Sequence, residues 1–340
     1  MTFTAIPTVR SSVRSLVLAL ACALAAAPAA SAAAPAKKAA LKPAAVAACP
    51  PVAQPPTNEQ IEAAQREARD RGFLWRITKD GRSSYLYGTI HVGRPAWLFP
   101  GPQLTAAVVG SDVVALELDV TDPGVMGALQ SGMAAKPGSP PLPPKLAQRL
   151  RAQLQAECLP DTLMDTLAPE AVATALVSLV GRRDGVDPAY GIDPVYAGMA
   201  KGLRKPIESL ESPDLQLKLL LSSTVEDQQE GVEKMLRELE RGQARSVLLK
   251  VARLWAESRF DELADYASWC DCLNTAAERA EFKAMLDDRN PGMADRIDAM
   301  HAAGRSVFAA VGSLHMTGPY ALPLLMERRG YHVERVDFKH

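Results

Sequence analysis

The chain has 340 residues, a formal net charge of −1 at pH 7 and 48% hydrophobic residues. This composition is typical of a globular protein. A charge near zero, without a cluster of Lys and Arg, gives no basic surface of the kind that nucleic-acid binding needs, so we expect no nucleic-acid partner.

The first 33 residues have the organisation of a secretory signal. Two arginines precede an apolar run from Ser15 to Ala27, and small residues follow around Ser31. The run is shorter than the roughly 20 apolar residues that a membrane span requires. We therefore predict a signal peptide at 1–33 and no stable transmembrane segment after its removal. The mature protein would be exported, and either periplasmic or secreted.

Residues 34–57 are rich in Ala, Pro and Lys and predict a low-complexity tether, followed by one domain at 58–340. Four cysteines remain after removal of the signal: Cys49, Cys158, Cys270 and Cys272. An even number in an exported protein indicates disulfides, and three pairings are possible. Because cysteines two positions apart rarely bridge each other comfortably, we expect Cys270 and Cys272 to reach Cys49 and Cys158 instead.

Predicted strands lie at both ends of the domain. Residues 73–91 read as a hairpin that turns at Lys79-Asp80-Gly81, and residues 112–120 as a buried, central strand. Near the carboxyl end, residues 306–312 and 331–338 are predicted strands with a helix between them. One short strand, 205–211, interrupts the middle of the chain.

The other predicted elements are helices, recognised by an apolar period near 3.6. They cover 58–72, 146–159, 168–183, 194–204, 227–243, 244–267, 276–290 and 292–304. Strands at both ends around a helical middle predict an α/β fold. Its mixed central sheet would be built from N- and C-terminal segments and flanked by helices, with a helical insertion at about 145–285.

Two similar turns carry the first chemical signal. In "SSYLYGTIHVG" and "RSVFAAVGSLHMTG", an apolar strand reaches Gly-x-x-His, at Gly88 to His91 and at Gly312 to His315. Strands of an α/β sheet deliver such residues to its carboxyl edge, where sites commonly lie. An imidazole there can bind a metal or transfer a proton. One such histidine is most simply a loop residue bonded to backbone, but two favour a shared site. We expect the remaining three histidines to lie on the surface.

Carboxylates and an Arg-Asn pair add to this signal. Glu117 lies in the apolar stretch "VVALELDV", where a carboxylate is costly unless a cation or donor receives it. The alternative is that the strand ends there and Glu117 is solvated. Glu211 ends a second short apolar run, in "PIESLES". Arg289 and Asn290 follow a helix and precede a proline, so they read as a helix exit.

Several stretches of the chain resemble the TraB/GumN family, which is related to the Tiki proteins. They are "YLYGTIHVG", "VALELD", "DDRNPGMADRI" and "VFAAVGSLHMTGPYALPLLMERRGYHVERV", and together they span about Phe73 to Val336. Similarity to the GumN-like branch implies an α/β domain with a mixed sheet. Similarity to the Tiki branch implies proteolysis that depends on a divalent metal, with His91, His315 and Glu117 at the positions of its signature residues.

The leading hypothesis is therefore an exported metal-dependent hydrolase, a peptidase with a peptide or protein substrate. His91, Glu117 and His315 would hold manganese, cobalt or zinc and activate a water. Glu211 would be a further ligand or general base. Arg289 would stabilise an oxyanion, and Asn290 would orient substrate. Gly88 and Gly312 would line the floor.

The alternative is a binding protein that uses the same crevice without turnover. Its ligand would be a peptide, a haem-like molecule or a polysaccharide precursor.

Overall fold

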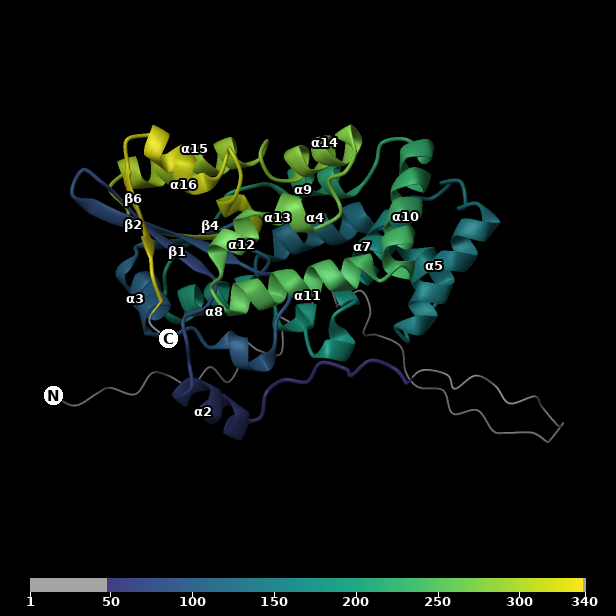
Figure 1. Cartoon of the computed structure of the whole chain (residues 1–340), viewed down its shortest axis with the longest axis horizontal. Coiled ribbons are helices and arrows are strands. Elements are labelled where there is room, and N and C mark those ends of the chain that lie inside the picture. The colour runs from purple at the N-terminus through teal and green to yellow at the C-terminus, as the bar shows by residue number, and fades with distance from the viewer. Residues whose placement is uncertain (1–47, 339–340) are drawn as a thin grey trace.

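A mixed six-stranded sheet organises the domain in the computed structural model, which describes residues 48–338 (Figure 1). The strand order is β4-β3-β5-β2-β1-β6. The strands are β1 (Phe73–Lys79), β2 (Arg82–Thr89), β3 (Val113–Leu116), β4 (Ile207–Ser209), β5 (Val307–Gly312) and β6 (His332–Val336). Neighbours among β4, β3, β5 and β2 are parallel, whereas β1 is antiparallel to both β2 and β6. The predicted α/β fold with a mixed sheet is confirmed.

The predicted hairpin is formed by β1 and β2. Asp80 and Gly81 connect the strands, and both have positive φ, 53° and 72°. Two consecutive left-handed residues make the type I′ turn whose twist suits a two-residue hairpin.

The core of the sheet lies at β3 and β5. All residues of β3 are buried, as are Val307 to Val311 of β5. Strands that are apolar on both faces need cover on both, and helices supply it. In Figure 1, α15 (Asn290–Ala302) and α16 (Leu322–Arg328) lie over one face, and α3 (Pro102–Gly110) and α8 (Asp193–Gly202) under the other. The strand predicted at 112–120 is shorter in the structure: β3 ends at Leu116, and Glu117 is the first residue after it.

The middle of the chain is mostly helical. The other α-helices are α2 (Asn58–Arg66), α4 (Pro123–Met133), α5 (Pro144–Ala156), α6 (Leu163–Thr166), α7 (Pro169–Leu179), α9 (Pro213–Leu220), α10 (Val225–Glu240), α11 (Gln243–Ala256), α12 (Phe260–Ala264), α13 (Tyr266–Trp269) and α14 (Ala276–Met285). Short 3₁₀ turns are η1 (Pro95–Leu98), η2 (Arg182–Asp184), η3 (Pro188–Tyr190) and η4 (Ser313–Met316). Helices α5, α7 and α10 share a second apolar core, which includes Leu150, Leu176 and Leu236.

The expected helix exit at Arg289 and Asn290 is wrong. Helix α14 ends at Met285, and Asn290 is the first residue of α15. Pro291 therefore opens a helix rather than closing one, because the first helical turn needs no backbone N–H from proline. The expected long helix at 244–267 is also interrupted, since Ser258 takes a positive φ of 54° between α11 and α12.

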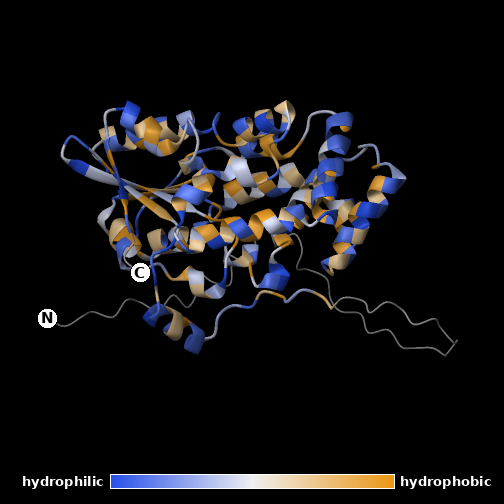
Figure 2. Ribbon diagram, in the orientation of Figure 1, coloured by the Kyte–Doolittle hydropathy of each residue, from blue (hydrophilic) through white to orange (hydrophobic). Residues whose placement is uncertain are grey.

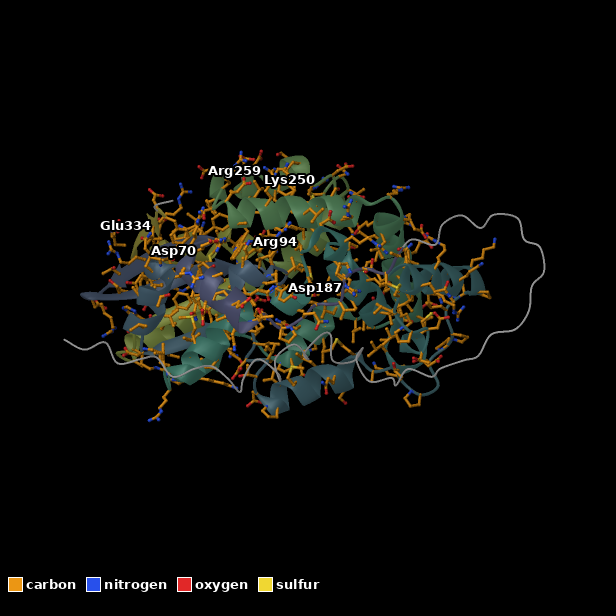
Figure 3. The ribbon with its side chains drawn as sticks, turned by 90° about the horizontal axis from the view of Figure 1, so that it is seen from below. Asp70, Arg94, Asp187, Lys250, Arg259 and Glu334 are labelled. Carbon is orange, nitrogen blue, oxygen red and sulfur yellow. A yellow bond between two sulfur atoms is a disulfide. The ribbon has the colours of Figure 1, made fainter. Side chains whose placement is uncertain are left out.

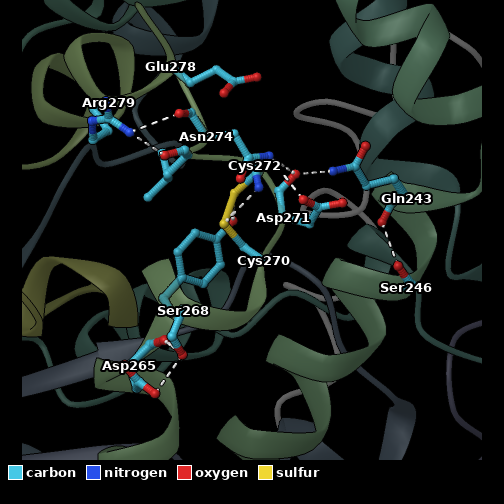
Figure 4. The surroundings of a disulfide bond; sticks show 12 residues. Gln243, Ser246, Asp265, Ser268, Cys270, Asp271, Cys272, Asn274, Glu278 and Arg279 are labelled. Carbon is cyan, nitrogen blue, oxygen red and sulfur yellow. Dashed lines mark hydrogen bonds between the residues drawn. A yellow bond between two sulfur atoms is a disulfide. The ribbon is translucent and has the colours of Figure 1, made fainter. Parts of the chain in front are cut away.

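The cysteines form two disulfides, but the expected pairing is wrong. Cys49 bonds to Cys158, and Cys270 bonds to Cys272 (Figure 4). The short bridge is possible because Asp271 between the two cysteines has a φ of 52°, which turns the chain back on itself. The resulting Cα–Cα distance is 5.1 Å, well within the range of a disulfide.

One of the three other histidines contradicts the expected surface position. His301 is only 1% exposed: its Nδ1 lies 2.9 Å from the Ser84 hydroxyl and its Nε2 lies 3.1 Å from the carbonyl of Lys79. It binds the end of α15 to the β1–β2 hairpin. His332 is exposed as expected, and His340 lies outside the described residues.

The predicted signal at 1–33 and most of the tether at 34–57 lie outside the described residues. Residues 48–57 contain no helix or strand, and the disulfide at Cys49 attaches this segment to the end of α5. Figure 2 shows helices of mixed hydrophilic and hydrophobic character. Between residues 48 and 338, no helix is both long and apolar enough to cross a membrane.

Candidate functional site

Glu117 stands at the centre of the residues predicted to form a site. It follows β3, where the chain leaves the sheet, and the residue is 8% exposed. Its Oε1 accepts a hydrogen bond from the backbone N–H of Gly312 at 2.7 Å, and its Oε2 accepts one from Arg289 Nη2 at 2.7 Å. The buried carboxylate is thus bound by a donor on one side and a cation on the other, as its burial requires.

Arg289 joins Glu117 to the second buried carboxylate. Its Nε and Nη2 donate to the two oxygens of Glu211, at 2.8 and 2.5 Å, while Nη2 also reaches Glu117. Its Nη1 donates to the carbonyl of Met285 at 2.8 Å. Gln216 on α9 adds an amide donor, 3.2 Å from Glu211 and 3.5 Å from Glu117. The guanidinium is therefore used inside the protein to hold the two glutamates.

His91 approaches Glu117 from the loop after β2. Its Nδ1 lies 2.8 Å from Asp193 Oδ2, and the other oxygen of Asp193 accepts from the Thr89 hydroxyl at 2.6 Å. Asp193 is the first residue of α8, so this helix aims the carboxylate at the imidazole. The Nε2 of His91 lies 4.0 Å from Glu117 Oε1. Its side chain is 66% exposed, so one face of the ring meets solvent.

His315 approaches the same oxygen from the turn η4 after β5. Its Nε2 lies 3.9 Å from Glu117 Oε1, and its Nδ1 lies 2.6 Å from Asn290 Oδ1. The Asn290 amide nitrogen donates to the carbonyls of His315 and Tyr320, at 3.2 and 2.8 Å. The amide oxygen can only accept, so Nδ1 of His315 donates and its Nε2 carries the lone pair.

The two Gly-x-x-His turns therefore meet at one place. Both Nε2 atoms lie within 4.0 Å of Glu117 Oε1, so the distance between them cannot exceed the sum of these two distances. A Cβ atom on Gly312 would lie 3.2 Å from that oxygen, 3.5 Å from His91 Nε2 and 3.7 Å from His315 Cδ2. The missing side chain of Gly312 leaves room between the three functional groups.

The surroundings shift the pKa values of the two histidines in opposite directions. The carboxylate of Asp193 raises the pKa of His91 to about 9. Burial lowers the pKa of His315 to about 4. Burial alone would raise the pKa of Glu117, but the charges of His315, His91 and Arg289 outweigh it and lower that pKa to about 2. At neutral pH Glu117 is an anion, His315 is neutral and His91 carries a proton in the absence of a competing cation.

The spacing of the three groups is wider than in a closed metal site. In the described part of the chain, no group of three or more His, Cys, Asp or Glu side chains lies close enough to hold a metal ion as it stands. Bonds of about 2.1 Å at a tetrahedral angle put ligand atoms about 3.4 Å apart. The distances from Glu117 Oε1 to the two imidazoles, 4.0 and 3.9 Å, exceed this by roughly half an ångström.

Four of the residues predicted for the site make contacts in the structure that differ from the expected roles. Asn290 is 0% exposed and binds His315, so it is not placed to orient substrate. Arg289 is engaged with both glutamates rather than presented to an oxyanion, and Glu211 is engaged with Arg289. Gly88 does not line the floor: a Cβ there would lie 3.1 Å from the Cα of Ser313, so this glycine allows β2 to pack against η4.

Sequence reasoning did not find Asp193 and Gln216. Asp193 had a local signal, because an aspartate immediately before a proline, in "GIDPVY", is typical of a helix start. That signal predicts a helix start, but it does not predict a hydrogen bond to a histidine 102 positions away. Gln216 has no distinguishing sequence context, since it lies within an ordinary amphipathic helix.

The fold and the site together define a class: an α/β domain whose mixed sheet brings two imidazoles and a glutamate to the carboxyl edge of its parallel strands. The TraB/PrgY/gumN family matches residues 73–335, which include every residue of this site, and the chain belongs to that family. Searches of curated proteins and of solved structures found no match.

Proposed function

We propose that the protein is an exported hydrolase that depends on a divalent metal ion and cleaves peptide bonds. The observation that carries the proposal is the convergence of His91 Nε2, His315 Nε2 and Glu117 Oε1 around the space beside Gly312. Two imidazoles and a carboxylate are a ligand set suited to zinc, manganese or cobalt. A bound ion of this kind polarises water and lowers its pKa toward neutrality.

The partners of the two imidazoles support this assignment. Asp193 accepts the Nδ1 proton of His91, and the Asn290 amide oxygen accepts that of His315. Such bonds fix the ring orientation of metal-binding histidines and direct Nε2 toward the ion. The local charge also favours a cation, because the three carboxylates of Glu117, Asp193 and Glu211 outnumber the two basic groups that they contact, Arg289 and His91.

The extra half ångström between the groups is compatible with closure on an ion. His91 lies in a loop and its side chain is 66% exposed, so its ring can move without repacking the core. His315 and Glu117 are buried and held by neighbours, and they form the rigid side of the site. His91 would therefore move, while Arg289 and Glu211 would position Glu117.

Export and a peptide substrate are parts of the same proposal. Two disulfides are compatible with an oxidising compartment, which supports a periplasmic or secreted protein. The peptide substrate rests on the resemblance of the two histidines and the glutamate to the signature residues of the Tiki branch.

The test is metal-dependent cleavage of peptides. Protein treated with a chelator is incubated with a peptide library in the presence of Mn²⁺, Co²⁺ or Zn²⁺, and products are identified by mass spectrometry. We expect cleavage to require one of these ions and to be lost in His91→Ala. His332→Ala is the matched control, since His332 is exposed on the edge strand β6.

Two outcomes would contradict the proposal. Cleavage that persists after complete removal of metal would reject the metal dependence and indicate that the two imidazoles act as an acid and a base. Retention of a peptide without cleavage under all metals would indicate a binding protein.

A further inference from the structure

A second concentration of charge lies beside the start of β1, outside the site described above. It borders a cavity of about 300 Å³ lined by Arg69, Asp70, Arg71, Ala256 and Glu257. A cavity of this size accepts a small molecule or one side chain of a larger one. Figure 3 labels Asp70, one of the lining residues, and Arg259, which pairs with Glu257.

The acidic residues of this cavity are already engaged. Asp70 accepts hydrogen bonds from the backbone N–H groups of Gln103 and Leu104, at 3.1 and 2.8 Å, and thereby caps the start of α3. Glu257 pairs with Arg259 at 3.3 Å and with Arg253 at 3.7 Å. Neither carboxylate forms an ion pair with the two arginines that line the cavity, although the charge of Asp70 acts on Arg71.

Those two arginines lie close together without a counter-ion from the described residues. Arg71 donates from Nη1 to the carbonyl of Arg69 at 3.3 Å, and no carboxylate between residues 48 and 338 forms an ion pair with either guanidinium. Arg71 is partly buried, and burial together with the charge of Arg69 lowers its pKa. Two like charges kept together at the wall of a cavity are stabilised when an anion binds between them.

We propose that Arg69 and Arg71 form a binding site for a small ligand that carries a carboxylate or phosphate group. Guanidinium groups bind both kinds of oxyanion through paired, charge-assisted hydrogen bonds. Arg71 lies two residues before Phe73, which pairs with Gly88 near the end of β2. The cavity therefore lies at the same end of the sheet as His91, which follows β2. The inference stands on the cavity alone and does not depend on hydrolase activity.

The test is calorimetric titration of the full chain with inorganic phosphate and, separately, with N-acetylglutamate. The protein is first treated with a chelator, so that phosphate or carboxylate binding to a metal ion cannot produce the signal. We expect at least one probe to bind, and its affinity to fall about 10- to 100-fold in Arg69→Gln and in Arg71→Gln. Added salt should weaken binding.

The controls separate this site from general charge effects. Arg66→Gln removes an exposed arginine at the end of α2, outside the cavity, and should leave binding unchanged. If Arg71→Gln does not fold, Arg69→Gln carries the test, because Arg69 is exposed and its side chain forms no ion pair with the described residues. Binding of phosphate alone or of the carboxylate alone would identify the ligand's charged group. The inference is wrong if neither probe binds, or if all three variants bind as the native protein does.

Discussion

Replacing Gly312 by alanine would put a methyl group among the three proposed metal-binding atoms. The new Cβ would lie 3.2 Å from Glu117 Oε1, 3.5 Å from His91 Nε2 and 3.7 Å from His315 Cδ2. An ion bound to these groups needs a position about 2.1 Å from each ligand atom. The methyl group would compete for that space and prevent the imidazoles from closing on Glu117.

The same substitution should have little effect on folding. Gly312 has φ −50° and ψ 135°, a conformation that alanine adopts without strain. Its shortest contact, to a carboxylate oxygen at 3.2 Å, requires a movement of only a few tenths of an ångström. We therefore expect the free energy of unfolding to change by no more than about 1 kcal/mol.

The affinity for metal should instead fall at least 10- to 100-fold, the range observed when the support of a metal ligand is lost. The assay is calorimetric titration of metal into protein treated with a chelator, with thermal unfolding of the same samples as the folding check. Gly231→Ala on α10 is the matched control, since a Cβ there has no heavy atom within 4 Å. Native metal affinity and native cleavage in folded Gly312→Ala would refute a site between these three residues.

Three further predictions concern the supports of the site and the disulfides. Asp193→Asn should lower the pKa of His91 from about 9 toward its ordinary value, as measured by NMR titration. Because the folded-state pKa lies above the unfolded one, the stability lost in this variant should be largest below about pH 6.5 and disappear as the pH rises through 9; an equal loss at all pH values would contradict this. Arg289→Met leaves two buried glutamates without their cation and should lower the free energy of unfolding, measured in urea, by about 3–5 kcal/mol. A loss below about 1 kcal/mol would mean that the carboxylates find other partners. Cys49→Ser opens a disulfide across 109 positions and should lower the free energy of unfolding by about 4–5 kcal/mol. Cys270→Ser opens one across 2 positions and should lower it by only about 1–2 kcal/mol. Equal losses of stability in the two variants would refute the dependence on loop length.

Local patterns in the sequence were sufficient to locate the strands of the sheet, but not all of their ends, since the strand predicted at 112–120 ends at Leu116. The alternation in residues 73–91 and the Asp80-Gly81 turn specify a hairpin because side-chain period and turn conformation depend on neighbouring residues. The apolar runs before Gly312 and Glu117 identify buried strands for the same reason. A residue that follows such a strand emerges at the carboxyl edge of the sheet, so His91, His315 and Glu117 could be assigned to that edge from their positions. The strand order that brings them together is a property of the tertiary structure.

Only the tertiary structure decided what the polar groups do there. Arg289 and Glu117 are 172 positions apart, and Asp193 and His91 are 102 apart, so no local pattern relates them. The sequence suggested that Arg289 and Asn290 would face a substrate, yet the packing of α15 against η4 buries Asn290 behind His315. The disulfide pairing likewise depended on a single backbone angle at Asp271, which the residue type permits but does not require. Strand and turn propensities act between neighbours, whereas ion pairs and hydrogen bonds between distant segments form only after the sheet has brought those segments together.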